Sequence, residues 1–182
     1  MIYRNDITEK NAAMQVAELM CAAARTAPKA RGTDTLEIMI LDGEDKDRLT
    51  AHMRDIGERT ERAFFIRDAG NLDRCHVVVL IGSSPAPRGL NCSLCGVPGE
   101  SSCEAAASFI PPISCAIDIS DLGIAVGSAA ATAIDHRMDN RVMFSAGVAA
   151  LELELFSDKI RICYGIGLSV SGKNVFFDRP PV

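Results

Sequence analysis

The segment Cys75–Gly82, with the sequence CHVVVLIG, decides the fold of this chain. Five consecutive positions, Val77 to Ile81, are apolar, so an extended chain would present apolar side chains on both of its faces. A strand of this kind is typical of the interior of a sheet that helices cover on both sides. The sequence therefore predicts an inner strand here, around which the other elements assemble.

Helical and extended patterns alternate on both sides of this strand. Strands are predicted at Leu36–Leu41 and 160–168, a short extended link at 141–144, and helices at about 7–24, 45–62, 118–134 and 146–155. This order predicts an α+β or α/β class. Because no repeat or linker divides the chain, we expect a single domain over residues 1–182.

Acidic residues at two predicted helix starts are interpreted as caps. Asp6 followed by Glu9 resembles a capping box, and Asp118 and Asp121 stand at the start of the helix 118–134. That helix is rich in Gly and Ala, which would let a neighbouring backbone approach closely. It is therefore expected at the centre of the fold or at a subunit interface.

Composition excludes several classes of function. The net charge of −5 lacks the basic face that nucleic-acid binding requires. The longest apolar runs are interrupted within a few residues, so no membrane-spanning helix is expected. The charged N-terminus does not resemble a signal peptide, which predicts a cytoplasmic protein with reduced thiols.

Four of the seven cysteines form the clearest chemical signal, Cys92-x2-Cys95-x7-Cys103-x11-Cys115. They lie in a Gly-, Pro- and Ser-rich segment at about 90–116, where the backbone can surround an inorganic centre. The other three, Cys21, Cys75 and Cys163, fall inside predicted helices or strands and are interpreted as small buried apolar residues.

The spacing of the four cysteines leaves the centre open between three alternatives. A zinc ribbon has two short Cys-x2-Cys pairs, whereas only one pair here is short. This asymmetry favours a [4Fe–4S] cluster, whose size accepts ligands from separated segments. Zinc and a set of free thiols remain the alternatives.

The segments AARTAPKARGTD (23–34) and GIGLSVSGKNVFFDR (165–179), with the four-cysteine loop between them, resemble the DUF2148 or "ferredoxin domain-containing" family. The resemblance covers essentially the whole chain. It implies a 4Fe–4S centre and no established reaction.

A more distant resemblance is to the flavin nitroreductases, carried by residues 20–40, 71–80, 121–133 and 141–147 in the same order. It implies an α+β, nitroreductase-like three-layer sandwich with a four-cysteine loop insertion, a homodimer, and an FMN site. The residues that this resemblance places near the flavin are Arg25, Thr26, Lys29, Arg31, Phe144, Ser145, Gly147, Lys173 and Arg179.

Taken together, these features predict a cytoplasmic homodimeric redox protein. One [4Fe–4S] cluster per chain would exchange electrons with FMN and pass them to a redox partner protein or a small-molecule acceptor. The alternative is a non-enzymatic ferredoxin-like electron carrier or a binding module stapled by its metal. If the protein is an enzyme, it is an oxidoreductase, and the sequence assigns no catalytic acid or base.

Overall fold

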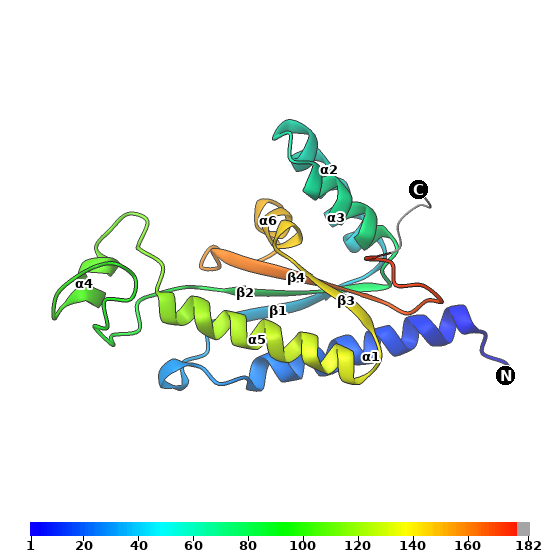
Figure 1. The fold of residues 1–182 in the computed structure, drawn as a ribbon, viewed down its shortest axis with the longest axis horizontal. Coiled ribbons are helices and arrows are strands. Elements are labelled where there is room, and N and C mark those ends of the chain that lie inside the picture. The colour runs from blue at the N-terminus through cyan, green and yellow to red at the C-terminus, as the bar shows by residue number, and fades with distance from the viewer. Residues whose placement is uncertain (178–182) are drawn as a thin grey trace.

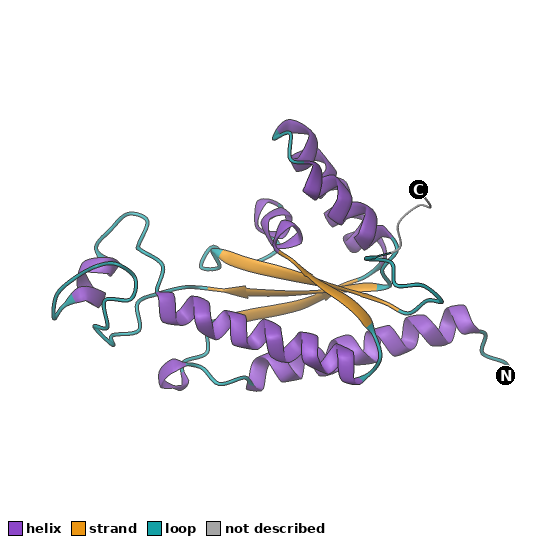
Figure 2. Ribbon diagram, in the orientation of Figure 1, coloured by secondary structure: helices purple, strands orange, loops and turns teal. Residues whose placement is uncertain are grey.

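The computed structural model describes residues 1–177, which form an antiparallel sheet of four strands between two layers of helices (Figures 1 and 2). The expected three-layer α+β sandwich is confirmed. The elements in chain order are α1 (Asn5–Thr26), η1 (Ala30–Gly32), β1 (Leu36–Leu41), α2 (Gly43–Arg59), α3 (Ala63–Asp73), β2 (Val77–Ser83), α4 (Ser102–Ala107), α5 (Ala116–Asp135), β3 (Asp139–Met143), α6 (Phe144–Glu152) and β4 (Ile162–Ser169).

Strand β2 lies inside the sheet, as its sequence predicts. The strand order is β1-β2-β4-β3, and all seven residues of β2 are buried. Val78 and Leu80 belong to one apolar core, whereas Val77, Val79 and Ile81 belong to the other. One strand therefore supplies both faces of the sheet with core residues, which is why its apolar run does not alternate with polar positions.

One face of the sheet is covered by α1 and α5, which lie side by side (Figure 1). Small residues at the contact, among them Ala17 and Ala129, are fully buried. The Ser128 hydroxyl donates a hydrogen bond of 3.2 Å to the backbone carbonyl of Ala23 on the neighbouring helix. The smooth surface expected of this helix thus serves close packing within the fold.

Helix α5 is also long and apolar enough to cross a membrane, so the expectation that no segment meets those criteria is wrong. Length and composition alone are weak evidence, because core helices of water-soluble folds meet the same test. In this fold α5 packs against α1 and the sheet, and Asp118 and Asp121 within it are buried.

The other face of the sheet carries α2, α3 and α6, and glycines bring α6 against β4. A Cβ atom added at Gly147 would lie 1.8 Å from the backbone oxygen of Cys163, and one at Gly165 would lie 2.6 Å from the Ala146 Cβ. Gly165 and Gly167 therefore serve packing.

Three elements differ from the prediction. Helix α3 was not predicted, although Phe65, Ala69 and Leu72 are buried at helical spacing; its short length hid the pattern. Residues 139–143, expected as a link beginning at 141, form the edge strand β3, whose first three residues are polar and give little apolar signal. The cysteine loop contains the short helix α4.

The proposed capping box is wrong. Helix α1 begins at Asn5, which places Asp6 inside its first turn, and the residue before the helix, Arg4, makes no side-chain cap. The acidic charge of Asp6 near the positive end of the helix dipole is the remaining favourable effect.

The contact at Gly147 gives a test of the packing between α6 and β4. Gly147→Ala should lower the free energy of unfolding by about 3 kcal/mol or more, because the added methyl group meets backbone that cannot rotate away. Gly70→Ala, inside α3 with nothing within 4 Å of the new Cβ, should be neutral or gain up to about 1 kcal/mol. Urea denaturation of both variants measures the difference; equal stabilities would contradict the described packing.

Candidate functional site

The four cysteines singled out by their spacing lie in one projecting segment, residues 84–115, which we call the cysteine lobe. It joins β2 to α5 and extends beyond the end of the sheet (Figure 1). Cys103 lies in α4, and Cys115 directly precedes the first turn of α5. Cys92 and Cys95 lie in the irregular chain that follows β2.

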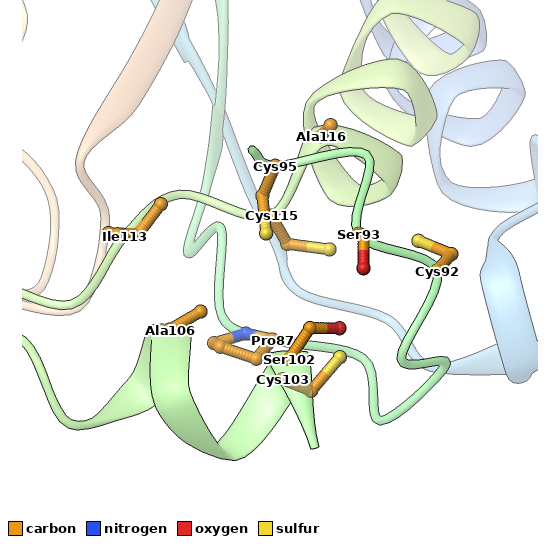
Figure 3. Close-up of a pocket in the computed structure, with 10 residues that line it drawn as sticks. All are labelled: Pro87, Cys92, Ser93, Cys95, Ser102, Cys103, Ala106, Ile113, Cys115 and Ala116. Carbon is orange, nitrogen blue, oxygen red and sulfur yellow. The ribbon is translucent and has the colours of Figure 1, made fainter. Parts of the chain in front are cut away.

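The structure brings these four cysteines to a single pocket (Figure 3). Their sulfur atoms point into the space between α4 and the chain on either side of it. Cys92 is exposed to solvent, whereas Cys115 is buried. The rest of the lining contains no charged side chain and consists of Pro87, Ser93, Ser102, Ala106, Ile113 and Ala116.

The pocket is suited to soft ligands but is narrow. Its volume is about 10 Å³, room for one water molecule. Among residues 1–177, no three His, Cys, Asp or Glu side chains are placed to hold a single metal ion together. A larger group would require the wall at 89–94 to move outward, and those residues are exposed and lack regular structure.

Two hydrogen bonds connect the two sides of the pocket. The Asn91 backbone N–H lies 3.3 Å from the Cys103 sulfur, and the Cys103 backbone N–H donates to the Asn91 side-chain oxygen at 3.0 Å. Backbone N–H donors directed at sulfur are a feature of thiolate ligands and cluster sites. The pairing holds the Cys92 segment close to α4.

A buried ion pair fixes the base of the lobe. The Arg88 guanidinium contacts the Asp118 carboxylate, and both side chains are almost inaccessible to solvent. Thr35 and Ser83 donate hydrogen bonds to the same carboxylate at 2.9 and 2.8 Å. Because Asp118 is in α5 and Ser83 ends β2, one carboxylate joins the two ends of the lobe to the sheet.

Asp118 and Asp121 are therefore not helix caps, and that interpretation is wrong. The Asp121 carboxylate accepts the backbone N–H of Ala30 in η1 at 2.9 Å. Arg88 and the Asp118 network were not predicted. The available signal was Arg88 itself, because it is the sole Lys or Arg between residues 75 and 136, a stretch of loop and apolar helix whose other charged side chains are acidic.

Further contacts close the lobe near its base. The Cys115 backbone N–H donates to the Pro85 carbonyl at 2.9 Å, which joins the beginning and the end of the lobe. Arg161 donates to the Pro112 carbonyl at 2.8 Å and to the Ser114 hydroxyl at 3.0 Å. The lobe is thus a closed loop whose base is rigid and whose tip is exposed.

The residues expected near a flavin lie in three places in one chain (Figure 1). Arg25 and Thr26 end α1, Lys29 directly precedes η1, and Arg31 lies in η1. Phe144, Ser145 and Gly147 lie in α6, on the opposite face of the sheet. Lys173 follows β4 at the far end of the sheet, and Arg179 lies outside the described residues.

Several of these side chains already have partners. Arg25 binds the Asp34 carboxylate and the Leu36 carbonyl, and Lys29 donates to three backbone carbonyls at the end of α1. The Ser145 hydroxyl donates to the buried Asp68 at 2.7 Å. Arg31 donates to the Arg88 carbonyl at 3.0 Å, so it contacts the base of the cysteine lobe.

Comparison with known proteins gives a family and a fold. Residues 112–179 match the family described as "Uncharacterized protein containing a ferredoxin domain (DUF2148)". This match includes Cys115 and stops short of the other three cysteines of the lobe. An uncharacterized protein from Archaeoglobus fulgidus is 36% identical, over 97% of each chain.

Solved structures show a nitroreductase-type fold. A BluB-like flavoprotein from Clostridium difficile 630 has a TM-score of 0.58 at 17% identity, over 92% of this chain and 84% of that one. A putative nitroreductase in complex with FMN from Desulfovibrio desulfuricans has a TM-score of 0.56 at 15% identity, over 92% and 80% of the two chains. At these identities the likeness concerns the fold alone.

The ion pair at the base of the lobe predicts a large effect of Asp118→Asn. The substitution leaves the Arg88 charge buried without its partner, which should lower the free energy of unfolding by about 3–5 kcal/mol. Asp135→Asn, at the exposed end of the same helix, should change it by less than about 0.5 kcal/mol. Thermal denaturation of the two variants tests this, and a similar small loss in both would show that the pair is not a stability determinant.

The cysteines outside the lobe predict a loss of stability at alkaline pH. Burial raises the pKa of Cys75 and of Cys163 from 9.0 to about 12. The unfolded chain releases these protons first, so stability should be full below about pH 9 and fall between about 9 and 12, by about 1.4 kcal/mol per pH unit for each thiol. Urea midpoints measured against pH should fall less steeply in a Cys75→Ala/Cys163→Ala variant; an unchanged slope would contradict the effect.

Proposed function

This chain belongs to the DUF2148 family, the uncharacterized proteins containing a ferredoxin domain, and we propose that it is a redox protein holding one [4Fe–4S] cluster. The ligands would be Cys92, Cys95, Cys103 and Cys115. The observation that carries the proposal is that four thiols from separate stretches of chain face one pocket without a charged side chain in its lining.

The donor set favours a cluster over zinc. A tetrahedral zinc ion requires ligands that meet at one point. A cubane presents its irons at separate corners, which suits thiols that surround a common space without converging on a single position. The apolar wall formed by Pro87, Ala106 and Ile113 would exclude water from the inner side of the group.

The chain supplies geometry and charge, and the bound cluster would supply one-electron transfer. Cys115 stands at the N-terminus of α5, where the helix dipole favours a negatively charged group. The Asp118–Arg88 pair holds Cys115 and the first residues of the lobe in a fixed relation. Cys92, exposed at the other side, would be the point of closest approach for a redox partner.

A flavin is the second part of the proposal. Solved proteins of the same fold are described as bound to FMN. Because the expected contact residues lie in three places in one chain, a flavin site would have to combine residues of two copies. We therefore propose a homodimer with FMN between the subunits, which would accept electrons from the cluster and pass them to a partner protein or small acceptor.

Anaerobic purification with assays of iron, zinc, acid-labile sulfide and released flavin tests the cluster and the flavin together. Iron and sulfide should be present in equal amounts, about four of each per chain, and flavin should accompany a dimeric mass in solution. Cys103→Ser should remove most of the iron and sulfide. The matched control Cys21→Ser, on α1 away from the lobe, should retain both.

The other outcomes are equally informative. Zinc without sulfide would replace the cluster with a structural metal and make the protein a binding module. In that case Cys95→Ser should lower the melting temperature together with the zinc content. Iron and sulfide without flavin would leave a simple electron carrier, and the absence of metal in anaerobic wild-type protein would overturn the proposal.

A further inference from the structure

A second cavity lies directly beside the cysteine pocket. Its volume is about 370 Å³, within the range of small-molecule binding sites. Pro87 lines both cavities. At two other points, adjacent residues line different cavities. Ala106 and Ile113 line the cysteine pocket, whereas their neighbours Ala107 and Pro112 line the second cavity. The wall between the two is therefore a single layer of residues.

The lining of the second cavity combines an apolar surface with positive charge. Ala86, Pro87, Ala107 and Pro112 form its apolar part. Lys159 lines the same cavity as an exposed side chain, and no hydrogen bond or salt bridge holds its ammonium group within residues 1–177. Its charge acts at longer range on Glu37, whose pKa is lowered by hydrogen bonds from Ser157 and, to a smaller extent, by Lys159. A cation without a hydrogen-bonded partner, beside apolar surface, is suited to a ligand that carries an anionic group on an apolar body.

The other two charged residues limit the ligand further. Arg161 is already bound to the Pro112 carbonyl and the Ser114 hydroxyl, so it fixes the wall while adding positive charge to the cavity. Asp158 contributes a carboxylate on the same side and would repel a second anionic group. The lining carries two positive charges and one negative charge, and the Glu37 carboxylate acts on Lys159 from outside it, so the site favours a ligand with a single negative charge.

We propose that this cavity binds a small organic anion with an apolar body and a single carboxylate or sulfonate group, whose charge pairs with Lys159. The ligand would lie across one layer of residues from the cysteine pocket. A role of this ligand as electron acceptor rests on the function proposed above, whereas the binding of the ligand does not.

Benzoate and benzyl alcohol form a matched pair of probes, because they share a ring and differ in charge. Both are titrated into the anaerobically purified full chain and followed by ligand-observed NMR. Benzoate should bind saturably and more tightly than benzyl alcohol. Lys159→Gln should weaken benzoate about tenfold and leave benzyl alcohol unchanged, since it removes one charge-assisted contact. The control Lys10→Gln removes a lysine on α1 that pairs with Asp42, and it should alter the binding of neither probe.

A second variant tests the position of the ligand. Ala107 is exposed on α4, so Ala107→Phe should fold with an unchanged melting temperature while filling the cavity and abolishing benzoate binding. The proposal is overturned by benzoate that does not bind saturably, by equal affinity in wild type and Lys159→Gln, or by undiminished binding to Ala107→Phe. Iron and sulfide assays on the same samples show separately whether the proposed cluster is present.

Discussion

The buried carboxylate of Asp118 is the interaction on which the candidate site depends. It receives hydrogen bonds from Thr35 beside β1 and from Ser83 at the end of β2, and it pairs with Arg88 in the lobe. A charge in this position is retained only when its partners are all in place, because an unpaired buried charge costs several kcal/mol. The Asp118 carboxylate therefore joins the sheet, the start of α5 and the base of the cysteine lobe.

This arrangement explains how a loop rich in Gly and Pro can form a defined pocket. The Gly- and Pro-rich stretch 89–101 has little regular structure and few buried residues. Its order comes from the two ends, where Cys115 bonds to Pro85 and Arg161 holds Pro112 and Ser114. Cys115 at the base is buried, Cys95 and Cys103 are half-buried, and Cys92 is exposed. The side of the pocket at Cys115 is therefore held in place, and the side at Cys92 is accessible to solvent.

The sequence predicted the core of the fold better than its polar connections. The strand Leu36–Leu41 was predicted with its observed bounds, and β2 was recognised because burial on both faces leaves a continuous apolar run. The edge strand β3 and the short helix α3 lack such a signal. The four cysteines could be grouped by spacing, but the partners of Asp118 could not, since Thr35, Ser83 and Arg88 meet it only through tertiary contacts.

A lobe closed at its base has a consequence for variation in chain length. The entropy lost on closing a loop grows only with the logarithm of its length, by about 0.6 kcal/mol for each doubling. Residues can therefore be inserted into or removed from the exposed tip with little effect on the fold, while the contacts of Asp118, Pro85 and Arg161 must be kept. Proteins that share this scaffold are free to differ in what the tip presents to a partner.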